Sequence, residues 1–322
     1  MKRIVILCDG TWNDVTAEKP TNVVRLAQAL RPAGSDDVTQ VPLYLPGVGT
    51  GRRGMTAWGR VKDKWLGGMM GLGLMENVVD AYRRLVFLYD VGDEIFVFGF
   101  SRGAYTARSL VGLIRSSGLL GRADLSRLGE VVARYRAGRP DTHPRTAESR
   151  EFRLSVSPHV MTSEADRPAY EANAEAKGLA PPVLLRLAYI GIWDTVGALG
   201  IPDRFGIAKL WNGRHAFHDT DLSSLVGAAR HAVALDERRR DFEPTLWSNL
   251  DVLNAGQDPD AIPYREAHFA GDHGSVGGGG EIVDLSSIAL SWAWTGPRPR
   301  ASSSTRSSAT GSRRRGTLWA PW

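Results

Sequence analysis

Short apolar runs alternate along the chain with segments whose apolar residues recur at helical spacing. The apolar runs are rich in β-branched and aromatic residues and predict strands at residues 2–8, 41–45, 93–98, 183–193 and 264–271. The helical spacing predicts helices at about 22–31, 74–90 and 104–114. Strands and helices that alternate in this way predict an α/β fold with a doubly wound, mainly parallel sheet.

The third of these strands leads directly into Gly99-Phe100-Ser101-Arg102-Gly103, and a helical pattern follows. A strand, a G-x-S-x-G turn and a helix form the nucleophile elbow of α/β hydrolases. A side chain at either glycine would collide with the neighbouring strand or helix, so the missing Cβ matters at both positions. The pattern predicts an α/β-hydrolase-like fold with Ser101 as the nucleophile; an ordinary strand-to-helix turn is the alternative.

A serine hydroxyl becomes a good nucleophile when a base takes its proton and a third group orients that base. In α/β hydrolases these partners follow the serine in the order acid, histidine, each after a later strand. Asp194 follows strand 183–193, and His273 follows strand 264–271 in a loop rich in glycine. We therefore predict Asp194 as the orienting acid and His273 as the base.

Each of these assignments has a competitor. Asp194 in its position is also typical of a residue that caps a turn or helix. His231 competes as the base, although the residues around it predict a helix rather than a strand end. Asp272 competes as the acid, but neighbouring side chains on an extended segment point apart, which argues against a contact with His273.

An oxyanion hole is the fourth element that acyl transfer needs. One donor is expected from the backbone N–H of Arg102, the residue after the nucleophile. Backbone amides of Gly10 and Thr11, after the first strand, are the predicted second source. Asp9 at the same strand end is also typical of phosphate- or metal-handling enzymes, but that chemistry needs more acidic ligands than the similar strand ends supply.

Five ordered motifs resemble the catalytic domain of type VI secretion phospholipase effectors, a family of α/β-hydrolase domains. They are Asp9-Gly10-Thr11-Trp12-Asn13, Pro46-Gly47-Val48-Gly49-Thr50-Gly51, Gly99 to Arg108, Trp193-Asp194-Thr195-Val196-Gly197 and His273 to Gly279. The resemblance spans residues 2 to about 292. It implies an α/β-hydrolase-like fold, Ser101 as nucleophile, His273 as the histidine, and hydrolysis of lipid esters.

The last motif departs from the family pattern. The family often has His-Ser-Asp-Val-Gly-Gly-Gly there, whereas this chain reads His273-Gly274-Ser275-Val276. If the missing aspartate orients the histidine in the family, Asp194 does the whole task here, or Asp272 substitutes for it.

Other glycine-rich and apolar segments have weaker interpretations. The run from Gly47 to Gly51 is similar to a dinucleotide fingerprint but has no helix start behind it, so we expect no cofactor. The small number of acidic residues at strand ends predicts no metal site. A tryptophan- and methionine-rich stretch is a candidate acyl-chain pocket, with core packing as the alternative; it comprises Trp58, Trp65, Met69, Met70, Leu72 and Leu74. Residues 115–182 predict a helical insertion that covers the active-site face as a lid, and residues 203–262 predict helices and loops.

Composition agrees with one catalytic domain over residues 1–296. The net charge is +5, but residues 285–322 contain six arginines and no acid, so subtracting those six charges leaves −1 for residues 1–284. The folded part is thus nearly neutral, which argues against nucleic acid as a partner. Residues 297–322 read as an Arg-, Ser- and Pro-rich disordered tail, or as a shifted reading frame of a GC-rich gene.

Targeting signals are missing from the pattern. Cys8 is the single cysteine, so no disulfide framework exists. Five apolar residues before Asp9 are too few for a signal peptide, and no apolar run reaches 18 residues. The sequence therefore predicts a cytoplasmic protein, with export by a signal-less route and transient membrane-surface contact left open.

Together these observations predict a serine hydrolase that cleaves carboxylic esters, of lipids or phospholipids, through a Ser-His-Asp triad and an acyl-enzyme. A catalytically silent protein that keeps the fold and binds a lipid or a partner is the rival interpretation.

Overall fold

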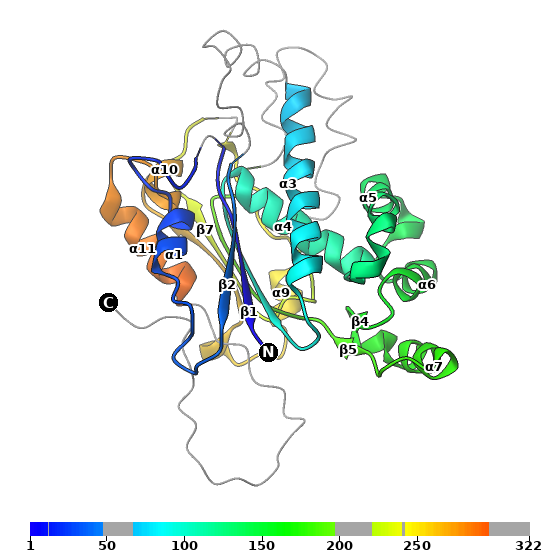
Figure 1. Cartoon of the computed structure of the whole chain (residues 1–322). Helices are drawn as coiled ribbons and strands as arrows, with labels where there is room; N and C mark the ends of the chain where they lie inside the picture. Colours follow the sequence, from blue (N-terminus) through cyan, green and yellow to red (C-terminus); the bar gives the residue numbers. More distant parts are fainter. Residues whose placement is uncertain (12, 48–66, 197–220, 240–241, 296–322) are drawn as a thin grey trace, which may run out of the picture.

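Six parallel strands form the central sheet of the computed structural model, which describes residues 1–11, 13–47, 67–196, 221–239 and 242–295 (Figure 1). In spatial order the strands are β2 (Gln40–Leu45), β1 (Arg3–Cys8), β3 (Glu94–Phe100), β6 (Arg186–Trp193), β7 (Ala229–Ala234) and β8 (Tyr264–Phe269). Each pair of neighbours is parallel. The predicted α/β class with a mainly parallel sheet is therefore confirmed.

Helices cover both faces of this sheet. Helices α1 (Asn22–Ala29) and α11 (Val283–Trp294) lie on one face, and α3 (Gly67–Leu88) and α4 (Arg102–Ser117) lie on the other (Figure 1). The strands alternate their side chains between the two layers, as a pleated strand must. In β1, Ile4 and Ile6 enter the core beneath α3 and α4, whereas Val5 and Leu7 enter the core beneath α1.

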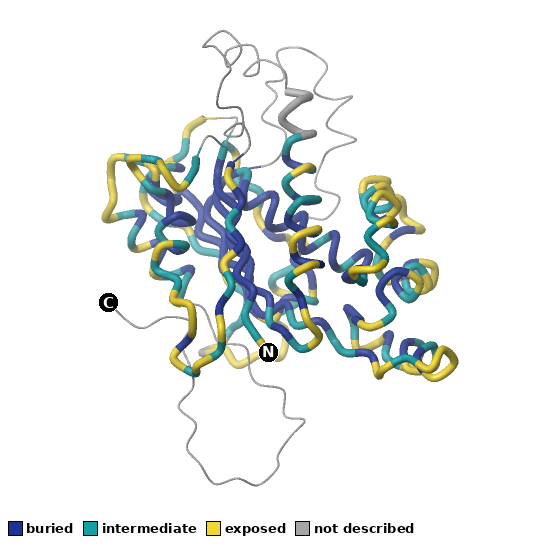
Figure 2. Tube along the Cα trace, viewed as in Figure 1, coloured by how far each residue is buried: buried dark blue, intermediate teal, exposed yellow. Residues whose placement is uncertain are grey.

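Burial follows this layering. Figure 2 shows a buried sheet with exposed residues along the outer faces of the helices. All four of those β1 side chains are fully buried. Each contributes about 1.5–3 kcal/mol to folding relative to an exposed position. A near-continuous apolar sequence such as Ile4-Val5-Ile6-Leu7 is what a strand covered on both faces requires.

The predicted elements match the structure except around β7. Segment 183–193 divides into β5 (Val183–Leu184), which pairs with β4 (Val160–Met161) in a separate small sheet, and the central strand β6. The helical and loop interpretation of residues 203–262 is wrong at 229–234, which form β7. The predicted helical position of His231 is corrected with it. All six residues of β7 are buried between β6 and β8, and that packing outweighs the preference of their alanines for helix.

The insertion expected at residues 115–182 is mostly helical. It contains the short 3-10 helices η1 (Arg122–Arg127), η2 (Pro140–Thr142) and η3 (Glu164–Asp166), and α5 (Leu128–Ala137), α6 (Ala147–Val156) and α7 (Arg167–Lys177). Its helices α5 and α6 pack against α4, and Thr162 Oγ1 donates to Arg115 O in the last turn of α4 at 3.5 Å. Just after α4, the Leu119 N–H donates to Ser157 Oγ at 3.0 Å. These contacts lie at the end of α4 opposite Ser101, and the lid role stays a prediction.

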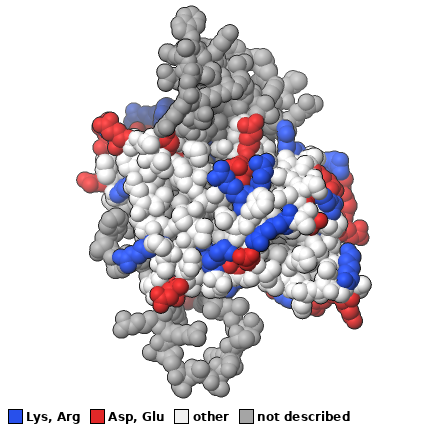
Figure 3. Space-filling model, viewed as in Figure 1, with Lys and Arg blue, Asp and Glu red and all other residues white. Residues whose placement is uncertain are grey.

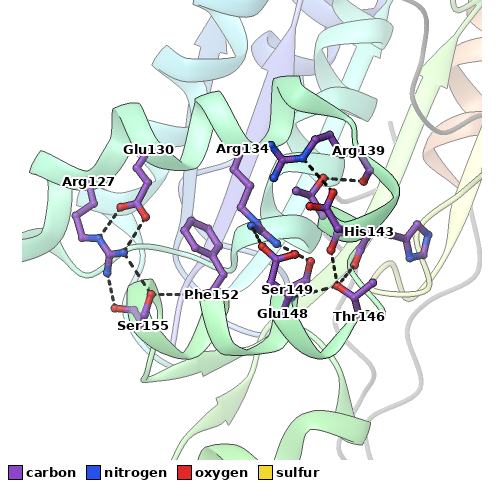
Figure 4. A network of polar contacts seen from close by, with 12 residues as sticks. Arg127, Glu130, Arg134, Arg139, His143, Thr146, Glu148, Ser149, Phe152 and Ser155 are labelled. Carbon is purple, nitrogen blue, oxygen red and sulfur yellow. Dashed lines mark hydrogen bonds and ion pairs between the residues drawn. The ribbon is translucent and has the colours of Figure 1, made fainter.

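Polar contacts join α5 to α6 within this insertion (Figure 4). Arg134 donates to Glu148 Oε1 at 2.8 Å and to Ser149 Oγ at 2.9 Å, while its guanidinium lies 4.6 Å from the centre of the Phe152 ring. Arg127 pairs with Glu130 at 2.9 Å on the same surface. Exposed pairs of this kind contribute about 0–1 kcal/mol each, so they align the two helices more than they stabilise the fold.

The outer surface of the insertion carries both signs of charge. Figure 3 shows basic and acidic side chains interspersed over it rather than a single basic patch.

Within the described ranges, no helix has the length and apolar content needed to cross a membrane.

Three further helices of the described residues follow β7 in the sequence. They are α9 (Leu250–Asn254), the 3-10 helix η6 (Pro259–Ala261) and α10 (His273–Gly277). The strand order reverses between β1 and β3, because β2 lies beyond β1 on one side and the later strands follow on the other. In parallel sheets such a switch point opens a crevice at the carboxyl ends of the strands. Ser101 follows β3 at this point, and Gly10 follows β1.

Candidate active site

The turn between β3 and α4 carries Ser101 in a strained conformation. Its φ is 58° and its ψ is −123°, a region that a residue with a Cβ rarely adopts. The Ser101 N–H donates to Trp193 O at 3.0 Å, which ties the turn to the end of β6. The Ser101 side chain does not cap α4, and the residue is 4% exposed.

The two flanking glycines permit this turn. A Cβ on Gly99 would lie 2.6 Å from Gly103 O at the start of α4. A Cβ on Gly103 would lie 2.1 Å from Cys8 O at the end of β1. Both distances are too short for any side chain, so the collisions that the motif predicts are found at both positions.

Asp194 and His273 come together from strands far apart in sequence. Asp194 Oδ2 lies 2.6 Å from His273 Nδ1, and both residues are buried. Asp194 Oδ1 accepts the Ala234 N–H at 2.9 Å, and the Asp194 N–H donates to Ala232 O at 2.7 Å. Asp194 has a φ of 38°. It therefore both joins the end of β7 and holds the imidazole.

Aromatic rings fix the His273 imidazole from two sides. The Phe100 ring lies 4.6 Å from it, and the Phe242 ring lies 4.7 Å away in an edge-on arrangement. Phe100 directly precedes Ser101, so this contact brings the imidazole to the turn that carries the serine. A Cβ on Gly277 would lie 1.9 Å from the Phe100 ring. This close contact explains the glycine in α10 (His273–Gly277), the histidine helix.

His273 is the first residue of α10. The prediction of a loop at this position, which rests on the glycine content, is therefore wrong. Asp272 is the N-cap of this helix: its Oδ1 accepts the Ser275 N–H at 2.9 Å and the Ser275 hydroxyl at 2.7 Å. These bonds lower the pKa of Asp272. Asp272 thus points to Ser275, at the position where the family often has its aspartate, while Asp194 contacts His273.

The competing histidine has a different environment. His231 is fully buried in β7, and its Nδ1 lies 2.7 Å from Glu266 Oε2. Its Nε2 accepts the Thr195 N–H at 3.2 Å, and its ring packs edge-on against Trp247 at 5.3 Å. Burial lowers the pKa of His231, although Glu266 opposes that effect. Both ring nitrogens are occupied, so this imidazole connects strands.

The loop after β1 holds the predicted oxyanion donors. The Gly10 N–H donates to Asp9 Oδ1 at 2.7 Å, so this amide is engaged in the described conformation, and the role of Gly10 as an oxyanion donor stays a prediction. Within the described residues the Thr11 N–H makes no such contact, and the buried Thr11 Oγ1 has no hydrogen-bond partner. Arg102 begins α4, where helix N–H groups point out of the helix end.

Asp9 organises this loop from beneath. Its carboxylate also accepts the Thr21 hydroxyl at 2.9 Å and the Tyr44 hydroxyl at 2.7 Å. Burial raises the pKa of Asp9, and the three hydrogen bonds oppose that rise. Thr21 caps α1 and bridges to Gly278 beside α10. One buried carboxylate therefore joins the loop after β1 to the histidine helix.

Glu237, Arg239 and Phe242 also contribute to the site, and the motifs in the sequence do not single them out. Glu237 Oε2 accepts the His273 N–H at 3.3 Å and Arg239 Nη2 at 2.7 Å. The Arg239 guanidinium lies 3.7 Å from the centre of the Phe242 ring. The signal in the sequence is a charged run that follows residues 229–234, and a helical prediction for those residues hides that this run lies at a strand end.

Some expectations fall outside these residues. Trp12, Trp58, Trp65, Val48 to Gly51 and the tail 297–322 lie outside the described residues, as do the side chains of Met69, Met70 and Leu72. Leu74 is described and is buried. Among the residues that are described, no three His, Cys, Asp or Glu side chains gather to hold a metal ion.

The sheet and its strand ends define an α/β protein in which a strained serine turn and a buried aspartate–histidine pair meet at one edge. The chain belongs to the family described as type VI secretion system, phospholipase effector Tle1-like, catalytic domain, whose model matches residues 2–295. This match confirms the family resemblance of the five motifs.

The chain is also similar to two longer proteins. An uncharacterised protein of Saccharomyces cerevisiae is 27% identical over 262 residues, which cover 78% of this chain and 33% of that protein. An uncharacterised protein from Pseudomonas aeruginosa, known from a crystal structure, matches with a TM-score of 0.44 and 16% identity over 91% of this chain and 45% of its own. The chain spans less than half the length of either of these proteins.

Proposed function

We propose that this chain is a serine hydrolase that cleaves a carboxylic ester of a lipid through an acyl-enzyme. Ser101 is the nucleophile, His273 the general base and Asp194 the group that orients the base. The fold is then α/β-hydrolase-like, and residues 1–296 act as one catalytic unit, since the sheet and α11 together span residues 3–294.

The observation that carries this proposal is the state of the two nitrogens of His273. Nδ1 is held by the buried Asp194 carboxylate at 2.6 Å, while Nε2 makes no hydrogen bond within the described residues. An aspartate in this position fixes the tautomer that leaves Nε2 ready to accept a proton. The Phe100 contact supports delivery of that proton from the adjacent Ser101.

The reaction then follows from these positions. Ser101 Oγ attacks the ester carbonyl carbon as its proton moves to His273 Nε2, and the imidazolium returns that proton to the departing alcohol oxygen. Water repeats the sequence on the acyl-enzyme and releases the fatty acid. Asp194 stabilises the imidazolium without taking its proton.

Charge on the carbonyl oxygen needs donors already in place. We assign the backbone N–H groups of Arg102 and Thr11 to this role. The first stands at the start of α4, where the helix dipole favours an anion. The second belongs to the loop that Asp9 holds through Gly10. A bilayer lipid as substrate also requires transient contact between this edge of the sheet and a membrane surface.

Labelling with a fluorophosphonate probe tests the proposal directly. The wild-type chain is expected to label at Ser101, and Ser101→Ala is expected to lose both labelling and hydrolysis of p-nitrophenyl esters and phospholipid vesicles. Ser109, which lies two turns further along α4 and is also buried, is the matched control as Ser109→Ala. Labelling that persists in Ser101→Ala would exclude Ser101 as the nucleophile. A chain that neither labels nor turns over any ester would support the silent binding protein instead.

A further inference from the structure

An arginine stands beside the histidine of the site, and the reaction described above does not use it. Arg239 lies on the segment that follows β7, with its guanidinium against the Phe242 ring, which in turn contacts the His273 ring. Arg239 also interacts electrostatically with Asp194 and Asp272. A single side chain, that of Phe242, therefore separates the Arg239 cation from the His273 imidazole.

This guanidinium is held in place on one edge and one face. Arg239 Nε and Nη2 donate to the two oxygens of Glu237 at 2.9 and 2.7 Å. Glu237 is itself anchored, because it accepts the His273 N–H. The Glu237 side chain is 5% exposed, whereas that of Arg239 is 54% exposed. The inner edge of the guanidinium is thus paired, and the outer edge faces solvent.

The outer edge retains hydrogen-bonding capacity. A guanidinium has five N–H donors, and within the described ranges Nη1 makes no hydrogen bond. An arginine that is fixed in this way loses little conformational freedom on binding an anion, and its planar fork matches carboxylate and phosphate oxygens. A contact that served only to hold Phe242 would not require an exposed outer edge.

We propose that Arg239 binds an anionic group of the substrate, the phosphate of a glycerophospholipid, beside the ester that is cleaved. The inference rests on the proposed function. In such a lipid the phosphate and an acyl ester are carried by the same glycerol backbone, so a phosphate held at Arg239 directs that ester toward His273. Arg239 is then the residue that selects an anionic ester over a neutral one.

The local charges explain why a cation is needed. Asp194, Asp272 and Glu237 are three carboxylates that interact electrostatically with Arg239, and Arg239 holds the pKa of Glu237 down at about 2. An anionic substrate that approaches this cluster without Arg239 is repelled by like charge. A neutral ester is not, so the two substrate classes respond differently to the loss of this one cation.

The test compares two soluble substrates that share the same acyl chains. Dihexanoyl glycerophosphate and dihexanoylglycerol are assayed below their aggregation limits with wild type, Arg239→Gln and Arg238→Gln. Arg238 is the matched control because it is the adjacent arginine and its loss changes the net charge equally. Arg239→Gln is expected to lower the ratio of the two kcat/KM values by about 10- to 100-fold in favour of the neutral ester, mainly through KM. Arg239→Lys is expected to restore part of that ratio.

Three results overturn the proposal. An equal loss on both substrates assigns Arg239 to holding Phe242 and His273. An unchanged ratio removes any role in selection. An equal shift in Arg238→Gln reduces the effect to general surface charge.

A second measurement does not depend on turnover. A dihexyl ether of glycerophosphate has no carboxylic ester to cleave, and its binding to the Ser101→Ala chain is measured by calorimetry with Arg239 present or changed to glutamine. Weaker binding in Arg239→Gln, but not in Arg238→Gln, supports the phosphate contact even if hydrolysis itself is never observed. Equal binding in all variants refutes it.

Discussion

Two buried imidazole–carboxylate pairs lie within the part of the chain that the structure describes, and their nitrogen–oxygen distances are nearly equal. His273 is 2.6 Å from Asp194, and His231 is 2.7 Å from Glu266. They differ in the second nitrogen of each ring. Nε2 of His231 accepts a backbone N–H, whereas Nε2 of His273 has no partner within the described residues.

The difference shows that a short contact with a carboxylate does not identify a catalytic histidine. An imidazole with both nitrogens bonded connects elements of the fold, while an imidazole with one open nitrogen can move a proton. The backbone agrees with this division: Ser101 and Asp194 are two of three described non-glycine residues with positive φ, and the third, Asp37, lies in a surface turn. Strain of this kind is typical of functional positions.

Substitution of each histidine in turn should reveal the largest difference in kcat. His273→Ala is expected to lower kcat by roughly 10⁵–10⁶, and the double variant with Ser101→Ala should be no worse, because nucleophile and base act as a unit. His231→Gln is the control and should retain most of its turnover at a temperature where it is folded. Esterase kinetics at matched folded fractions measure both. The opposite pattern would transfer the base to His231.

The two aspartates beside His273 provide the next test. Asp194→Asn is expected to keep the fold and lower kcat by roughly 10³–10⁴, because the amide favours the wrong tautomer. Asp272→Asn should cost less than about tenfold, since asparagine also caps helices well. Measured kcat values for both variants decide the comparison. A crippled Asp272→Asn beside a mild Asp194→Asn would reduce Asp194 to a strand cap.

Most of the sheet could be predicted from sequence because strands covered on both faces are apolar throughout. The runs that became β1 and β3 needed no tertiary knowledge. The serine turn could also be predicted, since close backbone contacts exclude a side chain at its two glycines. The positions of Asp194 and His273 followed from the rule that sites gather at the carboxyl ends of parallel strands.

Strand β7 could not be predicted from its sequence in the same way. Its sequence Ala-Arg-His-Ala-Val-Ala contains three alanines and two polar residues, and it becomes a strand because β6 and β8 bury it. Arg230 is tolerated there because it donates to the carbonyls of Ala229 and Pro263. The use of the Gly10 amide by Asp9 is a three-dimensional contact that no pattern of residue types encodes.

The carboxylate beneath the loop after β1 can sharpen the site further. Asp9→Ala removes the acceptor of the Gly10 N–H, and displacement of that loop is expected to lower kcat by about 10²-fold with little change in KM. Asp9→Asn keeps an acceptor and should recover part of the loss. Steady-state kinetics of both variants test this, and equal losses in the two would show that charge, not loop geometry, is the cause.

The structural role of the other histidine predicts a loss of stability. His231→Gln leaves Glu266 without its imidazole and is expected to lower the free energy of unfolding by about 3 kcal/mol. Urea denaturation at pH 7 measures the change. Glu266 also accepts the Trp247 N–H, so Glu266→Gln should have a similar effect. Stability equal to wild type in both would mean that the pair contributes nothing to the fold.

The smallest expected effect is the contribution of His231 to the pH dependence of the free energy of unfolding. Burial lowers the pKa of His231 below its ordinary value, so below about pH 6.5 the unfolded chain binds a proton that the folded chain does not. The free energy of unfolding should therefore fall as the pH falls, by up to about 1.4 kcal/mol per pH unit from this group. His231→Gln should show a shallower slope between pH 7 and 5.5, and parallel slopes would contradict the burial argument.

The close approach of Asn22 to the histidine helix has a consequence for how the chain matures. The Asn22 side chain donates to Val276 O and Ser286 O, so the first helix is secured by residues that are synthesised more than 250 positions later. A ribosome must therefore release nearly the whole of residues 1–286 before the serine, the aspartate and the histidine can be held together. Under the proposed function, a nascent or prematurely terminated chain cannot attack the membranes of the cell that makes it, and the onset of lipid hydrolysis marks the completion of folding.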